Sequence, residues 1–430
     1  MSKPRHVRLS LAILVCMTLA VCRAEAQLAT EPGDSGADTA LAIQNPDEYA
    51  WKLFLYLNRQ ALVGKAGVPD PSKPDLRSFD PDKDVVWETW ALATGGLPQF
   101  LAPGERNRSE VYLDKGAKPV AWEDLPRGTA TAKVFDANLT AFTRSVRSRL
   151  SANTGEPRLL IEPAVFFPKE FEVRMNKSTF DTIRNLELYS VEGLENKFRE
   201  ATTNKNRDIF KFEPMSKEVK AKWVKITEAD KLRYHWRTLQ RRNPDGTSVA
   251  EIWGLAGMHI LTKDLPNWFW SDFEHVDWEQ RQPDGSPDPR KSVDSTTRDD
   301  PLHGTIATAG KDGVRNETTG SVWENYRLRG TQVDFVDKKG VPTEVANTLI
   351  EPFNDGPSSC MTCHAKASVG LRPDPTRKRP PPFAANSLSP DFVNGIPDPT
   401  ALGDNGNTMT FVQTDFLWSM VFRAHSQNEQ

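Results

Sequence analysis

Hydrophobic and polar residues alternate along several stretches of the chain with a period of two, which is typical of half-buried β-strands. Two of these runs flank an Asn-Pro-Asp-Gly turn at 243–246, so we predict that they pair as an antiparallel hairpin. A shorter run at Phe171–Met175 is also predicted to be a strand. Leu159–Phe167 is likewise predicted to be a short strand, and the longer runs are Glu218–Lys225, Tyr234–Gln240, Ser248–Leu261 and Tyr326–Phe335.

Helical spacing of apolar residues is found in fewer places. Asp47–Leu62 has apolar residues every three or four positions after an initial Asp, which predicts an amphipathic helix. Ser178–Asn185 and Leu188–Phe198 are predicted to be helical or mixed. Asp415–His425 has helical spacing and is rich in aromatic residues, whereas residues 280–320 are polar and are predicted to form a long surface loop.

These patterns predict an α+β fold with two parts. A large, mixed and strand-rich body is expected over residues 27–345, followed by a small, mainly helical segment at 346–430. The chain of 430 residues is long enough for more than one domain. Its 12 tryptophans and 21 phenylalanines can supply a sizeable aromatic core.

The first 26 residues have the features of a secretory signal. A basic start is followed by the short apolar run Leu9–Val21 and by an Ala-Glu-Ala cleavage motif that ends at Ala26. The run is too short to span a bilayer, and no later stretch approaches a membrane span. We therefore expect cleavage after Ala26 and a periplasmic or otherwise exported protein. A retained anchor and a lipoprotein modified at Cys22 are the alternatives.

Charge excludes one class of partner. The formal net charge is −3, and removal of residues 1–26, with four basic side chains and one acidic, takes it to −6. A nucleic-acid-binding protein usually has a strongly basic surface, so nucleic acid is not an expected partner.

Signal cleavage would also change the number of cysteines that can form bonds in the mature chain. The chain has four cysteines, and cleavage removes Cys16 and Cys22. The remaining pair, Cys360 and Cys363, is followed directly by His364 in the order C-x-x-C-H. A close pair in an exported protein can form a disulfide. The adjacent histidine is instead typical of covalent haem attachment.

The spacing of this motif suits haem chemistry. On a helical turn, residues at i, i+3 and i+4 share one face. Cys360 and Cys363 can therefore reach the two vinyl groups of one haem edge, while His364 offers its imidazole to the iron as proximal ligand. The pattern predicts one covalent haem c. A redox disulfide and half of a zinc site are the alternatives, and the nearest other histidines, His303 and His425, are far away in sequence.

The motif resembles that of the c-type cytochromes, with the match centred on Cys360–His364 and extending over residues 346–430. In small members of that family a methionine before the C-terminal helix supplies the distal iron ligand, and Met409 holds that position here. The proline-rich stretch 372–382 departs from the family pattern. The phrases GMHI…WFWSDFEH, YRLRGTQVDF and SSCMTCHAKA are similar to large bacterial proteins of the cytochrome c family. That similarity implies an architecture and no particular activity.

His259, Glu274 and His275 are the remaining candidates for catalysis, and the two histidines are also alternative iron ligands. They lie in the aromatic passage GMHILTKDLPNWFWSDFEHVDWE, residues 257–279. Because neighbours in a strand point to opposite faces, adjacency alone does not pair Glu274 with His275. The alternative is that both histidines are hydrogen-bonded residues inside the main sheet. Three charged residues of this passage are predicted to be solvated: Lys263, Asp264 and Asp277.

The sequence is compatible with three functions. The preferred one is an exported monohaem c-type cytochrome in electron transfer, whose large body docks a redox partner protein. The second is a periplasmic haem oxidoreductase, of peroxidase or dehydrogenase type, with its substrate site in the body. The third is a haem-based ligand sensor. A filled sixth iron position favours electron transfer, whereas an open one allows ligand binding or catalysis.

Overall fold

A computed structural model describes a large part of the chain: residues 31–94, 109–125, 134–136, 171–242, 247–278, 317–343, 345, 350, 359–370, 396 and 411–427, without positions 34, 79 and 366. Several predicted features lie outside the described residues: the signal segment, the strand at Leu159–Phe167, the turn at 243–246, most of the loop at 280–320, the stretch 372–382 and Met409.

An eight-stranded sheet forms the centre of the described fold, which confirms the predicted mixed α+β class and the strand-rich body. Its strands run in the order β1-β3-β4-β6-β5-β2, and β7 and β8 continue from β6. Of these pairings, β2 with β5 is parallel and the others are antiparallel. The bounds are β1 Ala91–Thr94, β2 Val134–Asp136, β3 Phe171–Met175, β4 Lys217–Lys225, β5 Trp236–Arg242, β6 Ser248–Thr262, β7 Phe269–His275 and β8 Tyr326–Gln332.

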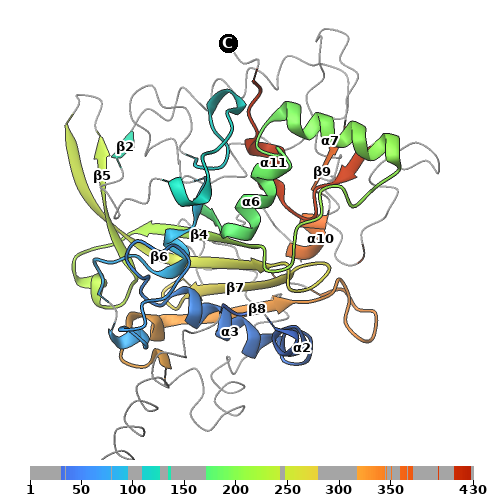
Figure 1. Cartoon of the computed structure of the whole chain (residues 1–430). Coiled ribbons are helices and arrows are strands. Elements are labelled where there is room, and N and C mark those ends of the chain that lie inside the picture. The colour runs from blue at the N-terminus through green and yellow to red at the C-terminus, as the bar shows by residue number, and fades with distance from the viewer. Residues whose placement is uncertain are drawn as a thin grey trace, which may run out of the picture.

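The long strand β6 organises this sheet. Its first half pairs with β5, as the alternating pattern predicts, and its second half pairs with β7. Strand β4 runs along the other edge of β6 over most of its length. The turn between β6 and β7, residues 263–268, therefore lies at the end of the sheet that faces the C-terminal segment (Figure 1).

Helices lie on both sides of the sheet (Figure 1). The α-helices are α2 Gly36–Gln44, α3 Pro46–Leu57, α6 Lys177–Asn185, α7 Val191–Asn204, α10 Cys360–Ala365 and α11 Trp418–Arg423. Short 3-10 helices are η1 Leu76–Ser78, η2 Val86–Thr89, η4 Asp114–Gly116, η5 Trp122–Asp124, η6 Ala229–Leu232 and η7 Val322–Asn325. No helix in the described part of the chain is long and apolar enough to cross a membrane.

Local sequence explains where the main helices begin. The side chains of Asn176 and Ser190 accept hydrogen bonds from the first turns of α6 and α7, so both helices have conventional N-caps. Helix α3 begins with Pro46, whose missing N–H costs nothing in a first turn. It ends at Leu57, earlier than the predicted helix at Asp47–Leu62.

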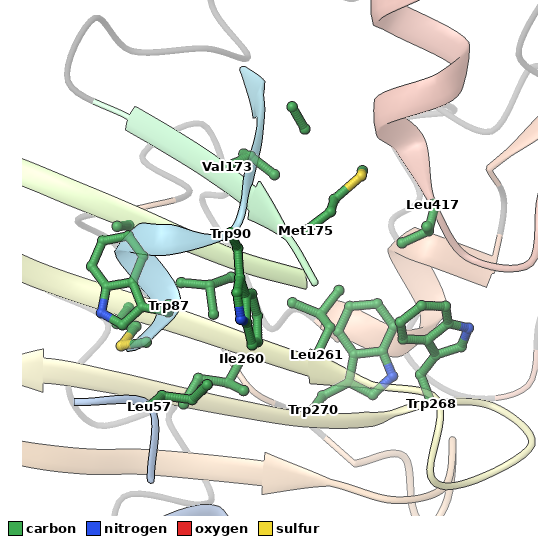
Figure 2. Packing of buried hydrophobic residues seen from close by; sticks show 14 of the residues in the cluster. Leu57, Trp87, Trp90, Val173, Met175, Ile260, Leu261, Trp268, Trp270 and Leu417 are labelled. Carbon is green, nitrogen blue, oxygen red and sulfur yellow. The ribbon is translucent and has the colours of Figure 1, made fainter. Parts of the chain in front are cut away.

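The two faces of the sheet are covered differently. Phe273 of β7 stacks on Phe54 of α3, with centroids 4.4 Å apart, so α3 covers the face to which Phe273 points. Trp270 points to the opposite face, because side chains alternate along a strand. That second face meets the C-terminal segment, and Figure 2 shows Leu261, Trp268 and Trp270 gathered below Leu417.

The C-terminal segment also contains strands. Besides α10 and α11 it has a two-stranded antiparallel sheet of β9 (Ser368–Gly370) and β10 (Phe411–Gln413), which the sequence pattern did not predict. Most of its buried apolar residues belong to the large hydrophobic cluster that also contains those of the body. A domain boundary at residue 345 remains a prediction. The residues that the segment contributes to the core are Met361, Ala365, Val369, Val412, Phe416, Leu417 and Met420.

Candidate functional site

The C-x-x-C-H motif forms the short helix α10, and its residues divide between two sides of that helix. Met361, Thr362 and Ala365 are buried. The three motif residues are half-buried: Cys360, Cys363 and His364. Cys360 and Cys363 are not joined by a disulfide in this structure. The helical spacing thus brings the three predicted site residues together on one half-buried side of α10.

A buried side chain of the sheet fixes the start of α10. Gln332, the last residue of β8, donates through Nε2 to Oγ of Ser359 at 2.9 Å. Its Oε1 accepts from the backbone N–H of Met361 at 3.1 Å. The Ser359 hydroxyl in turn accepts from the N–H of Thr362 at 3.0 Å. Because these bonds satisfy N–H groups of a first helical turn, Gln332 and Ser359 together cap the motif helix.

The imidazole of His364 is oriented by the backbone. Its Nδ1 lies 2.8 Å from the carbonyl oxygen of Phe416. A carbonyl only accepts hydrogen bonds, so this contact requires the proton on Nδ1 and leaves the ring lone pair on Nε2. Neutral histidine ligates metals through such a lone pair, and a carbonyl on the other nitrogen is a common way to fix the ring.

Trp270 packs against His364 from the sheet. The two ring centroids are 4.6 Å apart, with the planes inclined by 59°. The indole N–H of Trp270 donates to the carbonyl of Asn267 at 3.0 Å, so the buried ring has its polar atom satisfied. The aromatic passage therefore does reach the motif, as a wall beside the histidine.

The residues present fit a covalent haem. Two thiols and an imidazole share one half-buried side of α10, the imidazole has a fixed tautomer, and an aromatic ring borders it. Among the described residues there is no group of three or more His, Cys, Asp or Glu side chains arranged to hold a metal ion.

The face of the sheet that meets the C-terminal segment is unusually charged at its centre. Residues directly opposite each other in a ladder share a face. The register therefore puts the ionisable residues of β4, β6 and β7 on the same side as Trp270. We call them the charged face: Glu218, Lys220, Lys222, His259, Asp272 and Glu274. Most are buried, with Asp272 1% and Glu274 2% exposed.

Two close charge pairs lie on this face, and both involve predicted candidates. His259 Nε2 is 3.2 Å from Oδ1 of Asp272, its neighbour across the ladder. Glu274 Oε2 is 2.8 Å from a guanidinium nitrogen of Arg329. The pairing of β7 with β8 skips Arg329, so it is the extra residue of a bulge, and bulges re-aim side chains in this way.

His275 is on the opposite face and is an interior, hydrogen-bonded histidine. Its ring stacks on Tyr234 at a centroid distance of 3.6 Å. Nε2 donates to the carbonyl of Arg233 at 3.1 Å, and Nδ1 accepts from the N–H of Asp277 at 3.2 Å. Burial lowers the pKa of His275 to about 4, so the ring is neutral near pH 7. This arrangement supports a structural role and separates His275 from Glu274.

Two of the three charged residues expected in solvent are buried. Lys263 is 6% exposed and its Nζ lies 2.6 Å from Oδ1 of Asp415. The side chain of Asp264 is fully buried and accepts a hydrogen bond from Tyr49. Asp277 is partly exposed and pairs with Arg233. The prediction was wrong for Lys263 and Asp264 because the turn that holds them is covered by distant parts of the chain.

Glu218 is a further ionisable residue of interest that sequence reasoning missed. It is 6% exposed, and its carboxylate lies 3.4 Å from the hydroxyl of Ser419 in α11. Burial raises the pKa of Glu218 to about 7, although the charge of Lys220 and the Ser419 hydroxyl act in the opposite sense. Alternation in β4 places Glu218 where a solvent-facing residue is expected, so the sequence carries no signal for its burial.

The chain matches no protein-family model, no curated protein and no solved structure.

Proposed function

We propose that this protein is an exported monohaem c-type cytochrome that transfers electrons. The observation that supports it best is the oriented imidazole of His364, beside two thiols on the same side of α10. A haem bound there would supply a one-electron couple. In this proposal Cys360 and Cys363 hold the group covalently, and His364 presents Nε2 to the iron. The large body would dock a redox partner protein.

The distal ligand is part of the same proposal. Met409 remains the proposed sixth ligand, on the resemblance to small c-type cytochromes. It precedes β10 in the chain, and β10 pairs with β9, which follows the motif helix. A methionine ligand would close the iron to external ligands and favour electron transfer over catalysis.

A haem oxidoreductase is the second candidate, because one observation favours it. The buried pairs His259–Asp272 and Glu274–Arg329 lie on the same face of the sheet as Trp270, which packs against His364. A histidine held by a carboxylate is a usual general base. This function would require an iron site that is open to a substrate.

Optical spectroscopy of the purified protein tests both proposals. Spectra would be taken in the oxidised and reduced states, before and after carbon monoxide. A low-spin haem c spectrum that carbon monoxide does not change supports electron transfer. A high-spin spectrum that shifts with carbon monoxide favours the oxidoreductase or a ligand sensor. A protein with no haem after expression with a haem-attachment system contradicts the whole assignment.

Variants of the motif make this test specific. His364→Ala should lose native haem ligation, whereas Cys360→Ala with Cys363→Ala should lose covalent attachment, so that acid and organic solvent extract the group. His425→Ala, in the same segment, is the matched control and should retain a normal spectrum. A normal low-spin spectrum in His364→Ala would contradict the role of His364 as iron ligand.

A further inference from the structure

Backbone strain is concentrated near the motif histidine. Seven non-glycine residues of the described chain have positive φ angles. Two of them, Trp268 (61°) and Asp415 (45°), lie around the side chain of Lys263, and a third, Phe416 (71°), directly follows Asp415. Positive φ is unfavourable for bulky residues, and such residues persist where their surroundings fix them, often at functional sites. The cluster therefore requires an explanation.

The ammonium of Lys263 ties one of these strained positions, Asp415, to the body. Its Nζ donates to Oδ1 of Asp415 at 2.6 Å and to the carbonyl of Pro266 at 2.7 Å. The same nitrogen lies 5.7 Å from the ring centroid of Trp268. The other carboxylate oxygen of Asp415 accepts from the backbone N–H of Phe212 at 2.8 Å. Both oxygens of Asp415 are thus held by residues of the body.

The next residue carries the carbonyl that orients His364. Phe416 follows Asp415 directly, is 4% exposed, and accepts from Nδ1 of His364 at 2.8 Å. Its ring packs against Trp270, with centroids 6.2 Å apart. Two successive left-handed residues turn the chain so that this carbonyl points at the imidazole. The anchored carboxylate of Asp415 holds the turn in place.

We propose that Asp415 and Lys263 are positioning residues that set the strength of the hydrogen bond from His364 to Phe416, and thereby the midpoint potential of the iron. This inference rests on the proposed haem function. A strong acceptor on Nδ1 makes the imidazole more basic, and a more basic ligand stabilises the oxidised iron. The body, through Lys263, thus keeps the potential lower than the C-terminal segment would by itself.

Neutral variants of Lys263 distinguish an effect of positioning on the midpoint potential from a direct effect of the lost positive charge. Removal of a positive charge near the iron lowers the potential if charge alone acts, because the oxidised state is the more positive one. Positioning predicts the opposite. In the holo-protein, Lys263→Met should raise the midpoint potential, because the carbonyl is held less firmly. Lys263→Gln keeps a donor for Asp415 and should raise the potential less.

Variants of Asp415 and a remote pair complete the experiment. Asp415→Asn should raise the potential, and Asp415→Glu, which keeps the carboxylate, should restore part of the difference. Glu251→Gln is the control, because Glu251 pairs with Lys225 at 2.9 Å near the other end of β4. It should leave the potential unchanged.

The outcomes distinguish this inference from the proposed function. A wild-type protein without haem c contradicts the proposed function itself. A wild type with normal haem c, together with unchanged or lowered potentials in both Lys263 variants, overturns the positioning role alone. If Lys263→Met does not accumulate as holo-protein, the sign of the shift in Lys263→Gln decides.

Discussion

The indole of Trp270 and the imidazole of His364 lie against each other, with centroids 4.6 Å apart, although one belongs to the central sheet and the other to the C-terminal segment. Trp270 is 3% exposed and also contacts Phe416, whose carbonyl orients the histidine. The sheet therefore shapes the surroundings of the motif directly. The large body thus contributes Trp270 to the candidate site itself.

Removal of the contact between Trp270 and His364 should lower the stability of the protein. Trp270→Ala removes a large buried aromatic side chain, and we expect the free energy of unfolding to fall by about 3–5 kcal/mol. Urea unfolding of the holo-protein, followed by circular dichroism, measures the loss. Trp236→Ala is the control, since Trp236 is only half-buried and stacks under Lys231 at 4.1 Å. It should lose about 1 kcal/mol. Equal losses in the two variants would contradict the packing role of Trp270.

We expect the side chain of Gln332 to contribute strongly to the stability of the motif helix α10. Gln332→Ala leaves the buried hydroxyl of Ser359 and the N–H of Met361 with one partner fewer, which should cost about 1–3 kcal/mol. The same variant should have a lower yield of covalent haem, because its attachment helix is less well formed. Thr331→Ala, one residue earlier in β8, is the control with a normal yield. An unchanged haem yield in Gln332→Ala would show that α10 forms without this cap.

Much of the sheet can be predicted from the sequence, because its strands have clear local patterns. Phe171–Met175 matches β3, and the predicted runs around Glu218–Lys225 and Ser248–Leu261 match β4 and β6 to within a residue. Tyr326–Phe335 was predicted to be longer than β8, which ends at Gln332. Asp415–His425 was predicted to be more helical than it is, because Asp415 and Phe416 adopt left-handed conformations that precede α11.

The candidate site could be predicted only in part. The C-x-x-C-H spacing identifies Cys360, Cys363 and His364, because a covalent motif is local. The contacts of Lys263 with Asp415 and of Trp270 with His364 are long-range, and no local pattern predicts them. The burial of the charged face could not be predicted for another reason. Alternation along its strands predicts that the polar residues face solvent, whereas the structure buries most of them.

A buried network beside β5 should make the protein sensitive to acid. Glu88 pairs with Arg237, and its Oε1 lies 3.2 Å from Nε2 of His235. Burial opposes ionisation of Glu88, but the charge of Arg237 and the contact with His235 hold its pKa well below the usual range. Glu88→Gln leaves the buried Arg237 with only the more distant carboxylate of Asp84, 3.8 Å away, and should cost about 3–5 kcal/mol at pH 7.

The pH dependence of this loss has a definite sign. A carboxyl with a depressed folded pKa adds stability above its unfolded pKa, and that stability is lost as the pH falls through the folded value. The difference between wild type and Glu88→Gln should therefore be full at pH 7 and shrink below about pH 4.5, the ordinary value for Glu. Urea unfolding at pH 7, 5 and 3.5 measures it. A difference that is constant over this range would contradict the network as described.

Glu218 should show the opposite trend, because its folded pKa is raised to about 7. Below about pH 4.5 the carboxyl is protonated in both states and contributes no pH dependence. As the pH rises from there to 7, the unfolded state ionises first, so ionisation increasingly favours unfolding. Glu218→Gln cannot ionise and should avoid this penalty, which reaches about 3 kcal/mol at pH 8.

The measurement compares the stability of Glu218→Gln with that of wild type at pH 4.5 and at pH 8 by urea unfolding. The variant should gain on the wild type between the two pH values, whereas Glu88→Gln should change little over this interval and should lose on the wild type between pH 3.5 and pH 7. Both variants replace a buried carboxylate by the same amide, so opposite signs reflect the surroundings of each group. Those surroundings are an ion pair with Arg237 for Glu88, and Ser419 with the flanking charge of Lys220 for Glu218. A Glu218→Gln variant that follows the trend of Glu88→Gln would show that Glu218 is ionised in the folded protein at neutral pH.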